Sequence, residues 1–201
     1  SYESKYPLLD VDNPVTFGPV DFTDFYFEHR RQQFEGMVQA KQVILDVAAE
    51  FEKISGHSYG LFETYKLDDA DIAIVVLSSA AGTTRYVVDQ LRSQGIKAGL
   101  LKLRVFRPFP AEELAEALKD VPAVAVMDRS DSFTGQGGPV FAEIRSALYD
   151  LKKRPMMVNY IYGLGGRDVN VESIESVFKD LENINKTGVV GPKVRHLGVR
   201  E

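Results

Sequence analysis

Runs of apolar residues alternate with amphipathic stretches along most of this chain. Residues 71–77 are almost continuously apolar and lead into the small, turn-forming residues 78–83, a pattern typical of a strand covered on both faces. A helical spacing of three and four follows over 84–94. Three further strands are expected at 98–105, 121–127 and 156–161, each followed by a loop and a helix. This order predicts a mostly parallel sheet with helices on both faces.

The N-terminal part of the chain does not follow this alternation. Residues 1–24 are rich in proline, aspartate and aromatic residues without a sustained period, which predicts an extended arm held by its aromatic side chains. The surface that holds the arm is either its own domain or a partner. Between residues 27 and 54 the apolar positions recur at three and four, so we expect a helix that ends at Gly56. A short strand is expected within residues 59–67.

These patterns divide the chain into three parts. We expect an extended arm over residues 1–26, an α/β domain over 27–184 and a tail over 185–201. The last helix of the domain should begin at Asn170, whose side chain suits an N-cap. The tail carries basic residues between glycines and valines, and we expect it to pack along a neighbouring surface.

Composition and charge narrow the classes of function. A chain of 201 residues, 44% of them hydrophobic, can bury a sizeable core, and its net charge of −5 argues against nucleic acid or an anionic membrane as a partner. The absence of cysteine excludes disulfides, thiol catalysis and cysteine-ligated clusters from this chain. Without a membrane-length apolar run or a leader pattern, a soluble cytoplasmic protein is expected. The first methionine is Met37, so we expect a fragment of a longer protein.

Parallel strands bring the loops that follow them to one edge of the sheet, where open α/β sheets bind ligands. That edge should gather residues 78–83, 104–109, 128–138 and 163–168. The small residues of the first loop would let backbone amides approach a phosphate at a helix N-terminus. The alternative is a tight turn that requires small residues, since the loop matches no phosphate-binding motif. The glycine-rich loop 163–168 has the same two interpretations.

Arg107 is the most specific candidate at this edge. Pro108 and Pro110 stiffen its loop, so the guanidinium would be held where it can meet a carboxylate or a phosphate. An intramolecular ion pair with Asp128, or a role in loop packing, is the equally weighted alternative. The candidate binding residues at the sheet edge are Ser78, Ser79, Gly82, Thr83 and Arg107.

No catalytic residue and no metal site is predicted. Asp128 and Arg129 would be an acid/base pair, but adjacent Asp and Arg at a strand end are usually solvated or paired. No histidine has a neighbouring ligand at metal-binding spacing; the three are His29, His57 and His196. No nucleophile elbow and no Ser/His/Asp arrangement is visible. The residues therefore predict an α/β domain without a self-contained active site.

Four motifs, taken in order, carry a resemblance to a known family. They are VVLSSAAGT at 75–83, LRVFRPFP at 103–110, VMDRS at 126–130 and NYIYGLGGRD at 159–168. Together they resemble the C-terminal part of the alpha subunit of pyruvate:ferredoxin oxidoreductase, within the 2-oxoacid:ferredoxin oxidoreductase family. The resemblance covers residues 1–185 and is less diagnostic in the tail.

The resemblance implies a transketolase C-terminal-like fold, a three-layer α/β/α domain with a mixed sheet of about five strands. Residues 59–67 would supply the antiparallel strand. It also implies an enzyme that uses thiamine diphosphate with magnesium to convert pyruvate, coenzyme A and oxidised ferredoxin to acetyl-CoA, carbon dioxide and reduced ferredoxin. In the family, thiamine diphosphate lies between a preceding domain and a partner subunit, and cysteines bind the iron–sulfur clusters.

This chain would then be the part that shapes and assembles the enzyme, inactive alone and binding no cofactor alone. Its expected partners are the thiamine-diphosphate-binding and ferredoxin-like subunits, with ferredoxin as partner of the whole enzyme. No catalytic residue transfers by position. A sister enzyme acting on another 2-oxoacid or on oxalate is one alternative. A free-standing module for a nucleotide or coenzyme A is another, and a stand-alone hydrolase is disfavoured.

Overall fold

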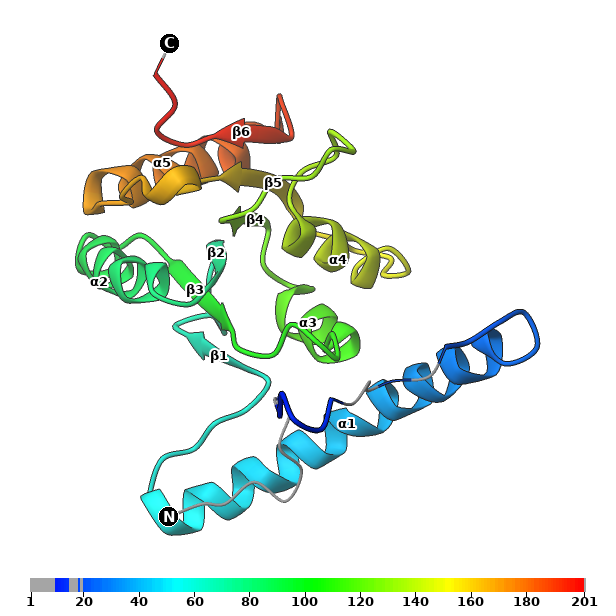
Figure 1. The fold of residues 1–201 in the computed structure, drawn as a ribbon. Helices are drawn as coiled ribbons and strands as arrows, with labels where there is room; N and C mark the ends of the chain where they lie inside the picture. The colour runs from blue at the N-terminus through cyan, green and yellow to red at the C-terminus, as the bar shows by residue number, and fades with distance from the viewer. Residues whose placement is uncertain (1–9, 15–17, 19, 201) are drawn as a thin grey trace. The chain divides into compact units, whose positions relative to one another are not determined.

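The computed structural model describes residues 10–14, 18 and 20–200. It divides into two units, Ser1–Gln39 and Ala40–Glu201. The second unit contains a six-stranded sheet with helices on both faces (Figure 1). Phe17 and residues 1–9 of the predicted arm lie outside the described residues, so the anchoring of the arm stays a prediction.

Helix α1 covers Tyr26–Ser55, which confirms the helix predicted from the spacing of apolar residues. A turn leads into it, since the Tyr26 N–H donates to the Phe22 carbonyl at 3.0 Å. Gly56 ends it with a φ of 74°, a left-handed conformation that glycine adopts without strain. All of its side chains are exposed or only partly covered.

The sheet is mostly parallel, as the alternation of strands and helices predicts. Its strands are β1 (Phe62–Tyr65), β2 (Ile72–Leu77), β3 (Ala98–Leu103), β4 (Ala123–Asp128), β5 (Met156–Ile161) and β6 (Val194–His196). They are arranged in the order β1-β3-β2-β4-β5-β6. Strand β1 is antiparallel to β3, which confirms the antiparallel strand expected within 59–67, and the other pairs are parallel.

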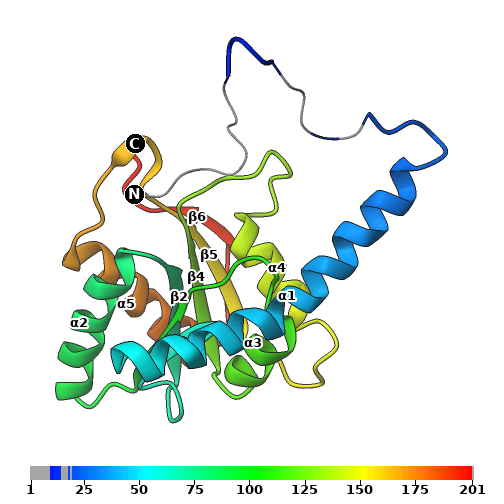
Figure 2. The ribbon, with the colours of Figure 1, turned by 60° about the horizontal axis from the view of Figure 1, so that its bottom comes forward.

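Two layers of helices cover this sheet. The helices are α2 (Ala80–Ser93), α3 (Ala111–Leu118), α4 (Pro139–Ala147) and α5 (Val171–Thr187). Alternate residues of a strand point to opposite faces. Ile72 and Ile74 of β2 pack in the cluster that contains α2 and α5, whereas Ala73 and Val75 pack in the cluster of α3 and α4. Figures 1 and 2 show the same division, and the three-layer α/β/α class is therefore confirmed.

Helix α2 begins earlier than the sequence pattern predicts. The expected start was residue 84, but the helix starts at Ala80. One left-handed residue, Ser78 with a φ of 61°, reverses the chain after β2. The next residues can then enter the helix at once, because alanine is a good helix former.

Helix α5 begins where its cap predicts. The Asn170 side chain accepts a hydrogen bond from the Ser173 N–H at 3.0 Å, which confirms the N-cap. The helix extends to Thr187 and ends at Gly188, whose φ is 71°. Val171 is only partly buried, whereas the other residues expected on its inner face are buried: Ile174, Val177, Phe178 and Leu181.

The C-terminal tail adds a sixth strand, which the sequence pattern does not predict. Residues Val194–His196 pair in parallel with Asn159–Ile161 of β5. Arg195 forms an ion pair with Asp180 of α5 and donates to the Tyr160 hydroxyl at 3.1 Å. Tyr160 in turn donates to Asp180 at 2.7 Å, and its burial and the nearby carboxylate raise the pKa of its hydroxyl. Instead of packing on a neighbouring surface, residues 194–196 complete the edge of their own sheet.

Candidate functional site

The strand order creates a crevice at the carboxyl edge of the sheet. The chain passes from β2 to β3 on one side, and then crosses to β4 on the other side of β2. The loops after β2 and β4 therefore diverge, and open α/β sheets bind ligands at such a switch point. A cavity of about 310 Å³ lies there. We call it the switch-point cavity.

Two candidate residues from the first loop, Ser78 and Ser79, line this cavity. Ser78 has a φ of 61°, a left-handed conformation that is uncommon for residues other than glycine and costs backbone energy. Neither serine hydroxyl has a hydrogen-bond partner among the described residues, and Ser79 does not cap α2 with its side chain. The loop thus presents two uncommitted hydroxyls at the start of a helix.

Arg129 and Tyr162 also line the cavity. The Arg129 Nε donates to the Gly163 carbonyl at 3.2 Å, while its two terminal nitrogens have no acceptor in the described chain. Tyr162 is 7% exposed, and no described residue is hydrogen-bonded to its hydroxyl. Burial raises the pKa of Tyr162, so its hydroxyl stays protonated and can donate.

Asp128 also lines the switch-point cavity, and its carboxylate is fixed by hydrogen bonds. It is 2% exposed, and its carboxylate accepts from the Val140 and Phe141 N–H groups at 2.9 and 3.1 Å at the start of α4. Asn159, fully buried on β5, donates to the same carboxylate and to the Val126 carbonyl, both at 2.9 Å. Its Oδ1 accepts from the Gly138 N–H at 2.9 Å.

This network defines the role of Asp128. Burial raises the pKa of its carboxyl, and the three donors oppose that shift. Each carboxylate oxygen is already occupied by donors that belong to the fold, so Asp128 joins α4 to the sheet. The acid/base pairing of Asp128 with Arg129, which the sequence disfavours, has no support in these contacts.

Arg107 forms an ion pair with a residue that the sequence does not indicate as its partner. Its Nη2 donates to the Glu143 carboxylate at 2.7 Å, and its Nη1 donates to the Phe106 carbonyl at 2.8 Å. The guanidinium also lies over the Phe106 ring, 4.0 Å from its centroid. The alternative of an intramolecular ion pair is thus observed, but the expected partner is wrong, because the Asp128 carboxylate is enclosed by its own donors.

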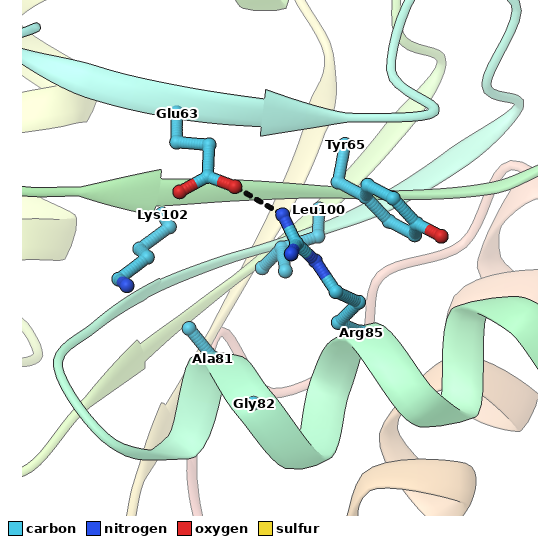
Figure 3. A pocket seen from close by; sticks show the side chains of 7 residues that line it. All are labelled: Glu63, Tyr65, Ala81, Gly82, Arg85, Leu100 and Lys102. Atoms are coloured by element: carbon cyan, nitrogen blue, oxygen red, sulfur yellow. Dashed lines mark hydrogen bonds and ion pairs between the residues drawn. The ribbon is translucent and has the colours of Figure 1, made fainter. Parts of the chain in front are cut away.

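The two remaining candidate binding residues, Gly82 and Thr83, do not line the switch-point cavity. Gly82 lines a small cavity of about 80 Å³ between α2, β1 and β3, and Thr83 lies beside it in the first turns of α2. Figure 3 shows the side chains of this cavity, where Arg85 is paired with Glu63. Arg104 reaches the same carboxylate at 2.6 Å. Glu63 is thus paired with two arginines, whereas Lys102, which also lines this cavity, has no ion pair among the described residues. Gly82 and Thr83 remain predictions as binding residues.

The glycine-rich loop after β5 forms a short 3₁₀ turn, Leu164–Gly166. Gly163, Gly165 and Gly166 all have positive φ values, so glycine is required there by the turn itself. Arg167 donates to the Gly198 carbonyl in the tail. These contacts fit the tight-turn interpretation of the loop better than an anion site.

The described residues offer no ligand set for a metal. No group of three or more His, Asp or Glu side chains is gathered in the part of the chain that the structure covers, and the sequence has no cysteine. His29 lies 2.7 Å from Asp21, away from any third ligand. None of the helices described is both long and apolar enough to cross a membrane.

Sequence reasoning places Arg129 at the sheet edge but misses Tyr162 and Asn159. Tyr162 and Arg129 each follow a strand directly, so their positions at the sheet edge were predictable from the strand boundaries. Asn159 gives a weaker signal, a single amide within a strand that is otherwise apolar. A polar residue there requires a buried partner, and Asp128 at the end of the adjacent strand was the available one.

The fold is an open, mostly parallel α/β sheet with a lined crevice at its carboxyl edge. Residues 70–174, just over half of the chain, match the family described as "Pyruvate:ferredoxin oxidoreductase core domain II". The chain belongs to this family.

Curated relatives match nearly the whole chain. Pyruvate synthase subunit PorA of Thermotoga maritima is 46% identical over 98% of this chain and 49% of its own length. The PorA subunit of Methanocaldococcus jannaschii is 43% identical over 90% of this chain and 46% of its own. Ketoisovalerate oxidoreductase subunit VorA of Pyrococcus abyssi is 40% identical over 94% of this chain and 48% of its own length. The chain thus spans about half the length of these relatives.

Solved structures with similar folds cover about two thirds of the chain. A 2-oxoglutarate:ferredoxin oxidoreductase chain from Magnetococcus marinus has a TM-score of 0.47 at 20% identity, covering 64% of this chain and 20% of that one. An inactive split-gene transketolase has a TM-score of 0.48 at 14% identity, covering 64% and 44%.

Proposed function

We propose that this chain is the assembly domain of a cytoplasmic, thiamine-diphosphate-dependent pyruvate:ferredoxin oxidoreductase. The whole enzyme would convert pyruvate, coenzyme A and oxidised ferredoxin to acetyl-CoA, carbon dioxide and reduced ferredoxin. The observation that carries the proposal is the 46% identity to a pyruvate synthase subunit over 98% of the chain. Other subunits or domains, including a thiamine-diphosphate-binding and a ferredoxin-like part, would be its partners.

The cofactors of the whole enzyme do not fit the residues of this chain. Iron–sulfur clusters need thiolate ligands, and the sequence contains no cysteine. Magnesium beside a diphosphate is usually held by one or two carboxylates together with the phosphates, and the described residues gather no group of three or more His, Asp or Glu side chains. We therefore assign thiamine diphosphate with magnesium and the clusters to the rest of the enzyme, and no reaction step to this chain.

An exposed apolar stripe on α1 supports an assembly role. Val43, Val47 and Ile54 are spaced by four and seven residues, which places them on one face of the helix. Each is at least 58% exposed. Lys41, on the other side of the helix, lies 3.0 Å from Glu113 of α3, so this half of α1 is attached to the domain by the opposite face. We call Val43, Val47 and Ile54 the α1 stripe.

Val47→Glu is expected to reduce incorporation of this chain into the assembled oxidoreductase at least about tenfold, because a charge would be buried in the subunit contact. Co-expression of the subunits and size-exclusion chromatography would measure incorporation. Ala49→Glu adds the same charge at an exposed position of α1 outside the stripe and should assemble normally. Normal assembly of both variants would contradict the role of the stripe.

The relatives do not fix the 2-oxoacid, since subunits of both pyruvate synthase and ketoisovalerate oxidoreductase match. The second candidate function is therefore that of a sister enzyme, which acts on a branched 2-oxoacid instead of pyruvate.

In the assembled enzyme, we expect coenzyme-A-dependent reduction of ferredoxin with a higher kcat/KM for pyruvate than for 3-methyl-2-oxobutanoate. The two substrates would be compared at equal enzyme concentration under anaerobic conditions. A preference for the branched acid would select the sister enzyme, and reduction of ferredoxin with neither acid would refute the proposed function.

A further inference from the structure

The walls of the switch-point cavity are mainly apolar. The apolar lining residues come from the ends of β2 and β4, the loop after β3 and the start of α4, and they are Leu77, Met127, Phe106 and Val140. A volume of about 310 Å³ falls in the range of small-molecule sites, which are typically apolar pockets with a few placed polar groups. The body of a ligand that fills this space should therefore be apolar.

Two side chains that line the cavity, Tyr162 and Arg129, have donor atoms without a partner in the described chain. Tyr162 is 7% exposed as a residue, but its hydroxyl is still accessible to solvent and has no hydrogen-bond partner among the described residues. It lines the cavity and is therefore available to a ligand. Arg129 is an exposed side chain whose Nε is fixed on the Gly163 carbonyl, and its terminal nitrogens have no acceptor in the described chain. Both side chains can donate into the cavity, so a ligand that they bind should carry an acceptor.

The charges around the cavity favour a single anionic group. Arg129 is the cation among its lining residues, and the nearby Arg107 is already paired with Glu143. The Asp128 carboxylate is directed into its own three donors. A phosphate usually takes several cations or a cradle of amides, whereas one guanidinium and one phenol suit a carboxylate.

We propose that the switch-point cavity binds a small organic carboxylate with an apolar body. The Arg129 terminal nitrogens and the Tyr162 hydroxyl would donate to the carboxylate, and Phe106 and Leu77 would contact the body. Ser78 and Ser79 line the same cavity, and their hydroxyls have no partner among the described residues. The backbone of Ser78 has a left-handed conformation. The proposal does not depend on which reaction the whole enzyme performs.

Calorimetric titration of the 201-residue chain with phenylacetate tests this site. We expect a dissociation constant below about 1 mM, an affinity in reach of a ligand with few atoms. Phenylacetamide, which has the same shape without the charge, should bind at least about tenfold more weakly. Benzyl phosphate and coenzyme A should also bind more weakly than phenylacetate. Tighter binding of either phosphate compound would overturn the assignment to a carboxylate.

Matched variants locate the binding. Arg129→Gln should weaken phenylacetate binding at least about tenfold, and Tyr162→Phe about threefold to tenfold. Tyr149→Phe and Arg154→Gln make the same changes at exposed positions and should bind as the unmodified chain does. Arg129→Lys keeps the charge and should bind better than Arg129→Gln, which separates loss of charge from loss of folding.

Thermal unfolding of each variant would establish that it is folded before titration. Absence of phenylacetate binding at 10 mM, about tenfold above the expected limit, would refute the site. Binding that is unchanged in both Arg129→Gln and Tyr162→Phe would refute it as well. Activity of the assembled enzyme has no part in these measurements, so their failure would leave the proposed function unaffected.

Discussion

Asn159→Leu is expected to lower the free energy of unfolding by about 3–5 kcal/mol. Leucine has a similar size, so the packing between β5 and its neighbours is kept while the polar contacts are lost. The Gly138 N–H and the Val126 carbonyl would lose their partner, and Asp128 would lose one of its three donors. Asn159 is fully buried, so water cannot replace these bonds.

Urea unfolding followed by circular dichroism would measure the loss. Asn183→Leu provides the control, because Asn183 is exposed on α5 and the same substitution there should change stability by less than about 0.5 kcal/mol. A loss at Asn159 no larger than that of the control would mean that the amide contributes little to the network.

The pH dependence of the free energy of unfolding is an independent test of the same hydrogen-bond network. Burial raises the pKa of Asp128 in the folded state above its unfolded value, so the folded chain binds this proton more tightly. Stability from this group is therefore complete below the unfolded pKa and is lost as pH rises through the folded pKa. Removing the Asn159 donor raises the folded pKa further. The loss caused by Asn159→Leu should consequently be larger at pH 7 than at low pH.

The regular part of the fold could be predicted from the sequence because its signals are local. Buried parallel strands produce uninterrupted apolar runs, and β2, β4 and β5 appear at their predicted positions within about two residues. Strand β6 has only three residues, two of them basic, and it forms because β5 offers an unpaired edge. No local pattern could indicate it.

The site was predictable in position and only partly in detail. Strand order fixes which loops meet, so Ser78 and Ser79 were placed correctly at the crevice. Arg107 lies on a neighbouring loop, but a long side chain can choose among several carboxylates, and it pairs with Glu143. The roles of Asp128 and Asn159 depend on the register between β4 and β5, in which Val126 is opposite Asn159. That register is a tertiary property.

Gly138→Ala is expected to destabilise the chain by about 3 kcal/mol, the upper range for a forced overpacking. A Cβ at this position would lie 2.6 Å from Oδ2 of Asp128 and nearer still to its Cβ and Cγ. The φ and ψ of Gly138 are −73° and 167°, an extended conformation that alanine also adopts, so backbone strain makes no contribution. The entire effect would come from displacing Asp128 from the N–H groups of α4.

Gly82→Ala is the matched control, because it adds the same methyl group in the opposite environment. Gly82 lies within α2 at an ordinary helical φ, and a Cβ there would meet no atom within 4 Å. Alanine should raise the free energy of unfolding by about 0.5–1 kcal/mol, since glycine loses more entropy in a helix. Thermal and urea unfolding of both variants would therefore show changes of opposite sign. Two losses of similar size would mean that the added methyl group, rather than contact with Asp128, is responsible.

Gly82 does not line the switch-point cavity, so phenylacetate binding should survive in Gly82→Ala. It should weaken in Gly138→Ala, because the displaced Asp128 disturbs the cavity wall.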